Sequence, residues 1–402
     1  MMPPGSDRRR AVLIMADHYL PGFKAGGPIR TLHNLIQTLG DDFRFLVITR
    51  DRDLSDIEAY PGVRLNEWVG VGKASVFYAS PDTLSWRGLG QLLDRSAYDA
   101  LYLNSFFSPL MTVLPLLRRR LSGRSSMPVI LAPRGEFAPG ALALKPVKKR
   151  IYLALARATG LLNGLRWQAT SEAEKAQILA TAGARPEDVD IVPNLASGGS
   201  TTMQVRALGR LKRAPGQLRM VFLSRIAPMK NLDFLIEALR QVGTPVLLTV
   251  HGPIVDLPYW RACQDAAKRL PAHVTFTYAG EVRPDRVAAA FAEHDVFVFP
   301  TRGENFGHVI LESLSAGTAV IVSDRTPWQA DSDGALTVLK LDQTAAWARA
   351  IEAWAKLDES AVQHRSDRAA ALANTYLSSG DAAHAHRQLF DTALAAAANP
   401  TG

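Results

Sequence analysis

Short apolar runs alternate with longer amphipathic stretches along most of the 402 residues of this chain. In the first half, apolar runs predict buried strands at residues 12–15, 45–49, 76–78, 100–103, 129–131, 164–169 and 190–192. The stretches between them can hold helices, most clearly at residues 29–39 and 145–156. This alternation predicts a parallel sheet, because parallel neighbours need a long crossover connection that is usually a helix.

The same alternation starts again in the second half of the chain. Apolar runs predict strands at residues 220–223, 246–250, 274–278, 296–299 and 319–322, and amphipathic stretches predict helices at 232–242, 259–269 and 286–293. From Ala345 onward the chain is alanine-rich and helical. Between the halves, residues 196–217 are polar and rich in small side chains, which is typical of a linker.

Together these patterns predict an α/β protein with two Rossmann-like domains, whose parallel sheets face each other across a cleft. We place the first domain at residues 1–195, the linker at 196–217 and the second domain at 218–376. We expect a last helix, within residues 377–402, to pack back on the first domain.

The segment from residue 295 to 324 contains two glutamates at informative positions. A strand at 296–299 leads through a loop into a helix that we expect to begin near Phe306 and to stop at Gly317. Glu304 precedes this helix, and Glu312 lies about six residues into it, roughly 9 Å along the axis. The two carboxylates are therefore too far apart to act on the same atom.

The same turn is suited to a sugar and a phosphate at once. A carboxylate can accept hydrogen bonds from two neighbouring hydroxyls, as on a ribose or a hexose ring. The backbone amides of Phe306, Gly307 and His308 at the helix start favour an anion such as a phosphate. The alternative is a surface loop with two solvated glutamates.

Two cations follow the first strand of the second half. Arg225 and Lys230 lie between that strand and the next helix, and we expect them in the same crevice as Glu304. An arginine that binds in a bidentate manner and a lysine that acts as a point charge suit a diphosphate. Plain surface charges are the alternative.

The first half offers two further candidate loops. Gly26 and Gly27 lie in a glycine-rich loop before a helix, where backbone can approach a ligand closely. Arg134 and Glu136 follow the strand at 129–131, at the strand end where open α/β sheets bind ligands. An ordinary ion pair within the loop is the alternative for these two residues.

Composition bounds the class of protein. Apolar residues make up 47% of the chain and charged residues 21%, as in a soluble globular protein. Cys263 is the single cysteine, which excludes internal disulfides and multi-cysteine metal sites and suits a reducing compartment. The apolar run after Arg10 is too short for a signal peptide, and no run reaches the roughly 18 residues that span a bilayer. We therefore expect a cytoplasmic protein.

The net charge of +8 is concentrated in the first half of the chain. Residues 1–196 carry 25 Lys and Arg against 18 Asp and Glu, and the remaining residues carry 21 against 20. The basic clusters lie at residues 8–10, 118–120 and 145–150. Such a half favours contact with an anionic membrane surface. A solvated basic face is the alternative, and nucleic acid is disfavoured because no recognition motif accompanies the charge.

With these residues in view, the chain resembles the family 4 glycosyltransferases, which are retaining GT-B enzymes. The resemblance is most specific at residues 303–324, which match the Glu-x(7)-Glu motif of that family, and it extends to residues 224–231, 169–175 and 192–194 and to the loop at Gly26 and Gly27. Residues 133–142 and 325–328 resemble members that build bacterial surface polysaccharides, such as exopolysaccharide or lipopolysaccharide.

The resemblance implies a role for each candidate. Arg225 and Lys230 would hold the diphosphate of a nucleotide-sugar donor and stabilise it as it leaves, Glu304 would bind the transferred sugar and Glu312 the ribose. The remaining donor-binding positions are implied to act through backbone or nearby groups: Gly26, Gly27, Val282 at the base, Asn305, Phe306, Gly307 and His308.

It also implies what the reaction needs. The enzyme would move a hexose to a glycan or lipid-linked glycan acceptor with retention of configuration, and Arg134 and Glu136 would belong to the acceptor or sugar pocket. No cofactor, metal ion or protein base is implied, because Arg and Lys supply the charge and the departing phosphate can take the acceptor's proton. Many relatives carry a histidine where this chain has Arg134, which leaves the donor sugar open.

Three other functions remain as alternatives. A nucleotide-sugar epimerase shares the fold class. A glycoside hydrolase also uses two carboxylates, but they flank one bond and need no phosphate-binding cations. A non-catalytic partner protein is expected to lack some of Arg225, Lys230, Glu304 and Glu312, and all four are present. The nucleotide, the sugar, the linkage, the acceptor and the oligomeric state are not specified by the sequence.

Overall fold

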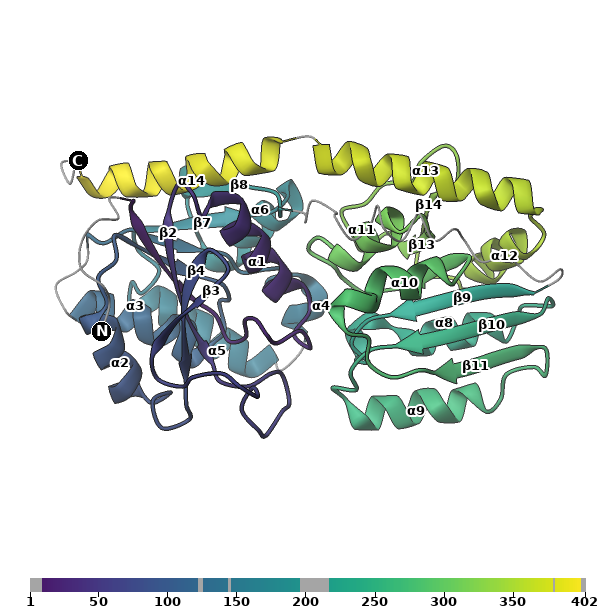
Figure 1. Ribbon diagram of the computed structural model, residues 1–402, viewed down its shortest axis with the longest axis horizontal. Helices are drawn as coiled ribbons and strands as arrows, with labels where there is room; N and C mark the ends of the chain where they lie inside the picture. The colour runs from purple at the N-terminus through teal and green to yellow at the C-terminus, as the bar shows by residue number, and fades with distance from the viewer. Residues whose placement is uncertain (1–8, 122–125, 144–145, 196–216, 379, 399–402) are drawn as a thin grey trace. The chain divides into compact units, whose positions relative to one another are not determined.

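The computed structural model describes residues 9–121, 126–143, 146–195, 217–378 and 380–398 (Figure 1). It divides the chain into two compact units, one formed by Met1–Ala196 with Gly380–Gly402 and the other by Ser197–Ser379. The predicted linker lies outside the described residues except for Gln217. Each unit is an α/β structure built on a mainly parallel sheet, as the alternation of apolar runs predicts.

The sheet of the first unit has the order β3-β4-β2-β1-β5-β6-β7-β8. Its strands are β1 Ala11–Met15, β2 Arg44–Arg50, β3 Trp68–Val71, β4 Ala74–Ala79, β5 Ala100–Leu103, β6 Val129–Leu131, β7 Leu165–Ala169 and β8 Val189–Ile191. Neighbouring strands pair in parallel except for β3 and β4, which are antiparallel. β3 is a half-exposed edge strand interrupted by Gly70, which explains why the apolar pattern did not predict it.

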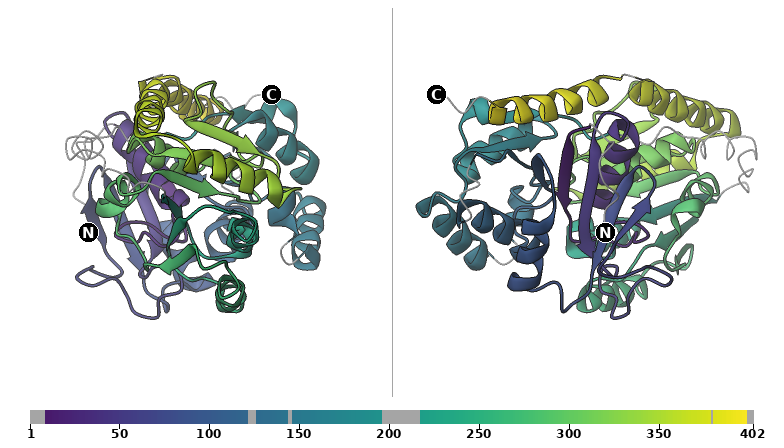
Figure 2. Two further views of the ribbon diagram at one scale, coloured as in Figure 1. Left: turned by 90° about the vertical axis from the view of Figure 1, so that its right-hand side faces the viewer. Right: turned by 60° about the vertical axis from the view of Figure 1, so that its left-hand side comes forward.

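Helices cover both faces of this sheet (Figure 2). They are α1 Gly27–Leu39, α2 Trp86–Arg95, α3 Leu114–Leu121, α4 Pro139–Leu142, α5 Pro146–Ala158 and α6 Glu172–Ala182, with short turns η1 Pro109–Val113 and η2 Pro186–Asp188. Alternate side chains of β1 point to opposite faces of the sheet. Leu13 and Met15 pack in the core beneath α2, α3 and α6. Val12 and Ile14 pack in the core beneath α1.

The last helix, α14 Asp381–Ala398, completes the first unit. Its Phe390 is fully buried, with ring centroids 5.3 Å from Phe43, 6.0 Å from Phe45 and 5.8 Å from Tyr102. The helix therefore covers the same face as α1 although it is the most distant element in sequence.

The sheet of the second unit has the order β11-β10-β9-β12-β13-β14, and all of its pairs are parallel. Its strands are β9 Leu218–Leu223, β10 Val246–His251, β11 Val274–Tyr278, β12 Val296–Phe299, β13 Ala319–Ser323 and β14 Leu336–Leu339. β9 lies between β10 and β12, so the strand order reverses beside β9. Open α/β sheets bind ligands at the carboxyl ends of the strands at such a switch point.

Helices flank this sheet in two groups. They are α8 Leu232–Leu239, α9 Leu257–Ala267, α10 Val287–Ala292, α11 His308–Ser315, α12 Thr344–Ala355 and α13 Glu359–Ser378, with η3 Pro228–Lys230 and η4 Pro284–Arg286. α8 packs beside α9 and α12, and α11 packs beside α10 and α13. α13 continues past residue 376, where we placed the end of the second domain, and the division between units falls at Ser379.

In the part of the chain that the structure describes, no helix combines the length and the apolarity that crossing a bilayer requires.

Candidate functional site

The loop after β9 carries the two predicted cations. Arg225 follows the strand by two residues, and Lys230 ends the short turn η3. Asn231 then adopts a left-handed backbone conformation, with φ of 62°, and caps the start of α8. The side-chain amide of Asn231 is buried, and its N–H donates to the carbonyl oxygen of Pro300 at 2.9 Å. This bond ties the loop after β9 to the loop after β12.

The loop after β12 is fixed by further hydrogen bonds to its neighbours. The backbone N–H of Arg302 donates to the carbonyl of Met229 at 2.8 Å, and the hydroxyl of Thr301 donates to the same carbonyl at 3.2 Å. The backbone N–H of Glu304 donates to the carbonyl of Arg325 at 3.0 Å. The loops after β9, β12 and β13 thus form one hydrogen-bonded platform at the carboxyl ends of the strands.

Lys230 and Glu304 form an ion pair on this platform. Their side chains are only 11% and 16% exposed, and the ammonium of Lys230 lies 5.4 Å from the centroid of the Phe299 ring. Burial lowers the pKa of Lys230, and the Glu304 carboxylate opposes that shift. The sequence analysis brought these two residues into one crevice but did not predict that they pair directly.

Arg225 is the second cation of this group. Burial lowers the pKa of its guanidinium as well, and the charge of Glu304 again opposes the shift. Two cations therefore share one carboxylate in a partly dehydrated environment, where charges interact more strongly than in bulk water. Two cations grouped beside one carboxylate favour an anion at this strand edge.

The turn into α11 begins later than predicted. Gly307 caps the helix with a φ of 79°, and the first helical residue is His308 rather than Phe306. The positive φ of Gly307 favours glycine, and a β-carbon there would also lie 2.8 Å from the side chain of Ile310. Glu312 is consequently the fifth residue of the helix, about 6 Å along its axis from the first rather than 9 Å.

Helix α11 presents the first of its amides next to the platform. The carbonyl of Gly307 accepts from the amides of Ile310 and Leu311, so the helix closes on itself from its third residue onward. The residues just before Ile310 are Gly307, His308 and Val309, and anion binding by the amides of Phe306, Gly307 and His308 stays a prediction. Glu312 is half-buried in the following turn, and Asn305 is half-buried in the loop before it.

An aromatic cluster that the sequence analysis did not assign supports this turn. The indole N–H of Trp328 donates to the carbonyl oxygen of Phe306 at 2.6 Å. The Phe306 ring has His308 at 4.7 Å, Trp328 at 5.9 Å and Tyr376 at 5.5 Å between ring centroids. Trp328 lies in the segment 325–328 that resembles other members of the family. No sequence signal linked Tyr376, from α13, to the turn that carries Glu304.

Val282 lies in the loop after β11 and is half-buried. This loop leaves the same edge of the sheet as the loops after β9 and β12, because all three strands run parallel. Nearby, a β-carbon at Gly252 would lie 1.8 Å from the carbonyl oxygen of Ser224, so the loops after β9 and β10 approach each other backbone to backbone. Glycine is required there.

In the first unit, Gly26 and Gly27 form the entry to α1. Gly26 has a φ of 71° and caps the helix, and its carbonyl accepts from the amide of Ile29 at 3.1 Å. The preceding loop is held by Asp53, whose buried carboxylate accepts from the amide of Phe23 at 2.6 Å. The sequence analysis missed Asp53. The part of Gly26 and Gly27 in phosphate binding stays a prediction.

Arg134 does not pair with Glu136, so the alternative of an ion pair within this loop is wrong. The guanidinium of Arg134 donates to the side-chain oxygens of Asn104 at 2.8 Å and Asn194 at 2.7 Å, and also to the hydroxyl of Tyr102. Arg134 thereby joins the loops after β5, β6 and β8.

Glu136 is committed to a different set of donors. Its carboxylate accepts from the hydroxyl of Ser105 at 2.9 Å and from the amides of Phe106 and Phe107 at 2.5 and 3.1 Å. Burial raises the pKa of Glu136, and these hydrogen bonds with the charge of Lys149 oppose the shift. Both residues hold loop structure, and their contact with an acceptor or sugar stays a prediction.

Ser171 and Glu174 at the start of α6 have the spacing of a capping box, which forms only in part. The hydroxyl of Ser171 accepts from the amide of Glu174 at 3.2 Å. The carboxylate of Glu174 reaches Thr170 and the amide of Gly135 instead of Ser171. This arrangement fixes the loop that carries Arg134.

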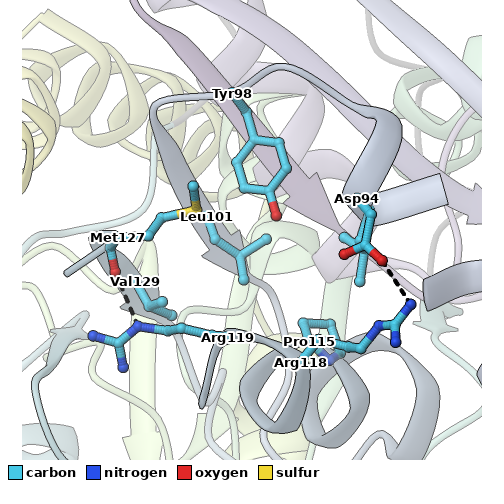
Figure 3. Close-up of a pocket in the computed structure, with 9 residues that line it drawn as sticks. Asp94, Tyr98, Leu101, Pro115, Arg118, Arg119, Met127 and Val129 are labelled. Carbon is cyan, nitrogen blue, oxygen red and sulfur yellow. Dashed lines mark hydrogen bonds and ion pairs between the residues drawn. The ribbon is translucent and has the colours of Figure 1, made fainter. Parts of the chain in front are cut away.

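A shallow pocket lies at the opposite edge of the first sheet, between α3 and the amino ends of β5 and β6 (Figure 3). Two of its cations are engaged: Arg118 pairs with Asp94 at 2.8 Å, and Arg119 donates to the carbonyl of Met127 at 3.0 Å. The basic cluster at 118–120 is thus partly structural. The pocket contains none of the predicted site residues, and ligands of such sheets bind at the other strand ends.

Comparison with known families covers both units. The family model described as "Glycosyl transferases group 1" matches residues 217–356, and the model described as "Glycosyl transferase 4-like domain" matches residues 26–195. Together the two matches cover most of the chain, and the first includes Arg225, Lys230, Glu304 and Glu312.

Individual proteins agree with this assignment. A phosphatidyl-myo-inositol mannosyltransferase of Mycobacterium tuberculosis is 37% identical over 123 residues, which are 29% of this chain and 30% of that protein. The chain spans less than half the length of the curated relatives it matches.

Two solved structures share the fold over nearly the whole chain. Anabaena Alr3699/HepE, in complex with UDP and glucose, has a TM-score of 0.66 at 18% identity, covering 96% of this chain and 99% of that one. WaaG, a glycosyltransferase involved in lipopolysaccharide biosynthesis, has a TM-score of 0.61 at 15% identity, covering 95% and 98%.

Proposed function

The chain belongs to the family 4 glycosyltransferases of GT-B fold, and from that premise we propose that it moves a sugar from a nucleotide-diphosphate sugar to a glycan or lipid-linked glycan. The observation that carries this proposal is the group of Arg225, Lys230 and Glu304 at the switch point of the second sheet. A donor of this class has an anionic diphosphate joined to sugar hydroxyls, and the group offers a partner for each.

In the proposed complex, Arg225 and Lys230 bind the diphosphate. Lys230 has three N–H donors, so it can keep its pairing with Glu304 while it donates to a phosphate oxygen. Negative charge grows on the diphosphate as its bond to the sugar breaks. Cations already held in a partly dehydrated site stabilise that charge without reorganising.

Glu304 binds the transferred sugar and Glu312 binds the ribose in this proposal. Glu304 lies on the loop beside Lys230, next to the position of the leaving phosphate. Glu312 lies one turn into α11 and is offset along the helix axis, so it reaches a different part of the donor. The backbone near Val282 serves the base.

We propose that the reaction retains the anomeric configuration and needs no metal ion. The bond between the anomeric carbon and the phosphate oxygen breaks, a bond to the acceptor oxygen forms, and the acceptor's proton passes to the leaving phosphate. Arg225 and Lys230 then supply the positive charge that a metal ion supplies in other transferases.

Cell-surface polysaccharide synthesis is the proposed context, with the protein at the inner face of the cytoplasmic membrane. WaaG supports a surface glycan, and the mannosyltransferase relative, named for a phosphatidyl-inositol, supports an acceptor that carries a lipid. The bound UDP and glucose of Alr3699/HepE make UDP-hexoses the first donors to test.

A thermal-shift screen against nucleoside diphosphates and nucleotide sugars tests donor binding, because a ligand of the folded state raises its apparent stability. The nucleotide sugar that raises the melting temperature should then be incubated with the protein and candidate acceptors. The anomeric form of the product is assigned by proton NMR. A retained product that needs both donor and acceptor supports the proposal. Conversion of the donor without acceptor would instead identify an epimerase.

A further inference from the structure

Helix α5 exposes a continuous apolar line. Val147, Ile151 and Leu155 are 67%, 56% and 59% exposed. Their spacing of four places them one above the other on a single face of the helix. Single exposed apolar side chains are common on soluble proteins, but a line of three large ones along one helix is not.

The opposite face of α5 is anchored in the first unit. The Tyr152 ring packs 5.2 Å from Phe106 and 5.7 Å from Phe107 between centroids, and Ala156 is buried. The ammonium of Lys149 donates to the carbonyl of Ala141 at 2.7 Å. These contacts hold the helix in one orientation. The apolar line is therefore exposed because the folded structure directs it outward, and not because the helix is frayed.

Cations flank the line on both sides. At 100° per residue, Lys148 lies about 60° to one side of Ile151 and Arg150 about 100° to the other, and both are exposed. None of the 13 residues of α5 is acidic. An apolar line bordered by basic residues is typical of a helix that lies in a membrane interface, with its apolar side chains among the acyl chains.

Charge distinguishes a lipid surface from a second copy of the chain. A two-fold contact through this face would bring Lys148 and Arg150 toward the same cations of the other copy, and α5 offers no carboxylate to pair with them. Phosphate groups of anionic lipids complement both cations. The observations therefore favour a membrane.

We propose that α5 docks the protein on an anionic membrane, with Val147, Ile151 and Leu155 inserted at the headgroup boundary and Lys148 and Arg150 on lipid phosphates. The inference rests on the proposed function only in that a lipid-linked acceptor gives the docking a purpose. It goes beyond attraction of a basic half, because it assigns part of the binding to three apolar side chains. Lys145 of the predicted basic cluster lies outside the described residues.

Flotation of the full chain with vesicles tests the assignment. We expect binding to mixed phosphatidylcholine and phosphatidylglycerol vesicles and weak binding to pure phosphatidylcholine. The double substitution Ile151→Gln with Leu155→Gln should lower the partition coefficient about tenfold or more at every salt concentration, because the apolar contribution is not screened. Lys148→Gln with Arg150→Gln should lower it mainly at low salt. Glutamine preserves helix propensity in both variants.

Ile57→Gln is the matched control, because Ile57 is 86% exposed in the same unit but stands away from α5 in sequence. It should bind like the wild type. Circular dichroism of each variant checks that the fold is kept.

A fluorescent label reports insertion directly. Cys263 is buried, so a cysteine introduced as Leu155→Cys can be labelled selectively with an environment-sensitive dye. Its emission should shift to the blue with anionic vesicles, whereas the same dye at Ile57→Cys should not respond.

Two results would overturn the inference. One is equal vesicle binding by the wild type and the Ile151→Gln, Leu155→Gln variant. The other is a dimer in gel filtration that this variant abolishes while neither protein binds vesicles, which would assign the line to a second copy. Nucleoside diphosphate binding, measured by calorimetry on the same samples, separates this outcome from failure of the proposed function: a protein that binds nucleotide but no vesicle loses only the membrane assignment.

Discussion

Lys230 and Arg225 carry the most consequential prediction at the scale of single residues. Replacing either with alanine should leave the fold intact and lower kcat/KM by roughly 10²-fold or more, because each removes charge stabilisation of the leaving diphosphate. Steady-state kinetics with the donor found in the thermal-shift screen measure this. Arg240→Ala is the matched control, since Arg240 pairs with Glu237 of α8 and both side chains are exposed.

The Lys230 variant needs one further comparison, because its loss leaves the half-buried Glu304 carboxylate unpaired. A second variant that combines Lys230→Met with Glu304→Gln removes both charges and should recover stability without recovering activity. Near wild-type turnover in either folded single variant would refute the diphosphate assignment.

Glu304 and Glu312 should be separable by calorimetry. Glu312→Ala should raise the dissociation constants of nucleoside diphosphate and donor alike, since its proposed partner, the ribose, is common to both. Glu304→Ala should leave nucleoside diphosphate binding nearly unchanged and lower kcat for the full donor, as expected for a contact to the reacting sugar. Equal loss of nucleoside diphosphate binding in the two variants would contradict the assignment.

At the scale of elements, α14 is joined to the first sheet through a buried histidine. His386 is fully buried, its Nε2 lies 3.2 Å from the side-chain nitrogen of Gln168, and its Nδ1 lies 2.8 Å from the carbonyl of Ala382. Burial lowers the pKa of His386 to about 4, with a small opposing contribution from the Ala382 carbonyl and a further lowering by the charge of Arg134. The folded protein therefore holds this imidazole neutral.

This burial predicts a pH dependence of stability. The unfolded chain binds a proton at His386 near pH 6.5 and the folded chain only near pH 4, so the contribution is complete above pH 6.5 and is lost as the pH falls toward 4. The loss is about 3 kcal/mol. His386→Gln should flatten the dependence of the unfolding free energy on pH in that window, measured by urea titration. An unchanged slope would mean that His386 is not the responsible group.

Elements with a strong apolar pattern were predictable from sequence. The ends of helices, and strands with a weak apolar pattern, were not. β5, β6 and β12 match the predicted ranges, because each is a continuous buried run. β11 also matches its predicted range, although exposed residues alternate with more buried ones along it. β14 was missed because three of its four residues are only half-buried. The start of α11 was placed two residues early, since Gly307 adopts a left-handed backbone conformation that delays the helix to His308.

The candidate site shows the same division. Residue types and strand ends indicated Arg225, Lys230 and Glu304, because a parallel sheet brings the ends of neighbouring strands to one edge. The support of Phe306 by Tyr376 was not predictable, because 70 positions separate them and only the packing of α13 on α11 joins them. The hydrogen bonds of Arg134 and Glu136 likewise depend on loops far apart in sequence.

At the scale of the whole molecule, the two units differ in what they offer a ligand. The first carries most of the net positive charge and the apolar line of α5. The second carries Arg225, Lys230, Glu304 and Glu312, each proposed to contact the donor. The division of labour proposed here, a membrane and acceptor unit with a donor unit, follows from this distribution.

This distribution predicts that a nucleoside diphosphate stabilises the second unit in particular. Each unit has its own sheet and its own buried core, so each can open without the other. At about 100 times its dissociation constant, a ligand of the folded state adds about 2.7 kcal/mol to the free energy of opening. Hydrogen exchange measured by mass spectrometry should therefore slow in β9, β12 and the segment from residue 303 to 312, and Lys230→Ala should reduce the effect. Protection confined to the strands of the first unit would place the nucleotide there and contradict the assignment of Arg225, Lys230 and Glu312.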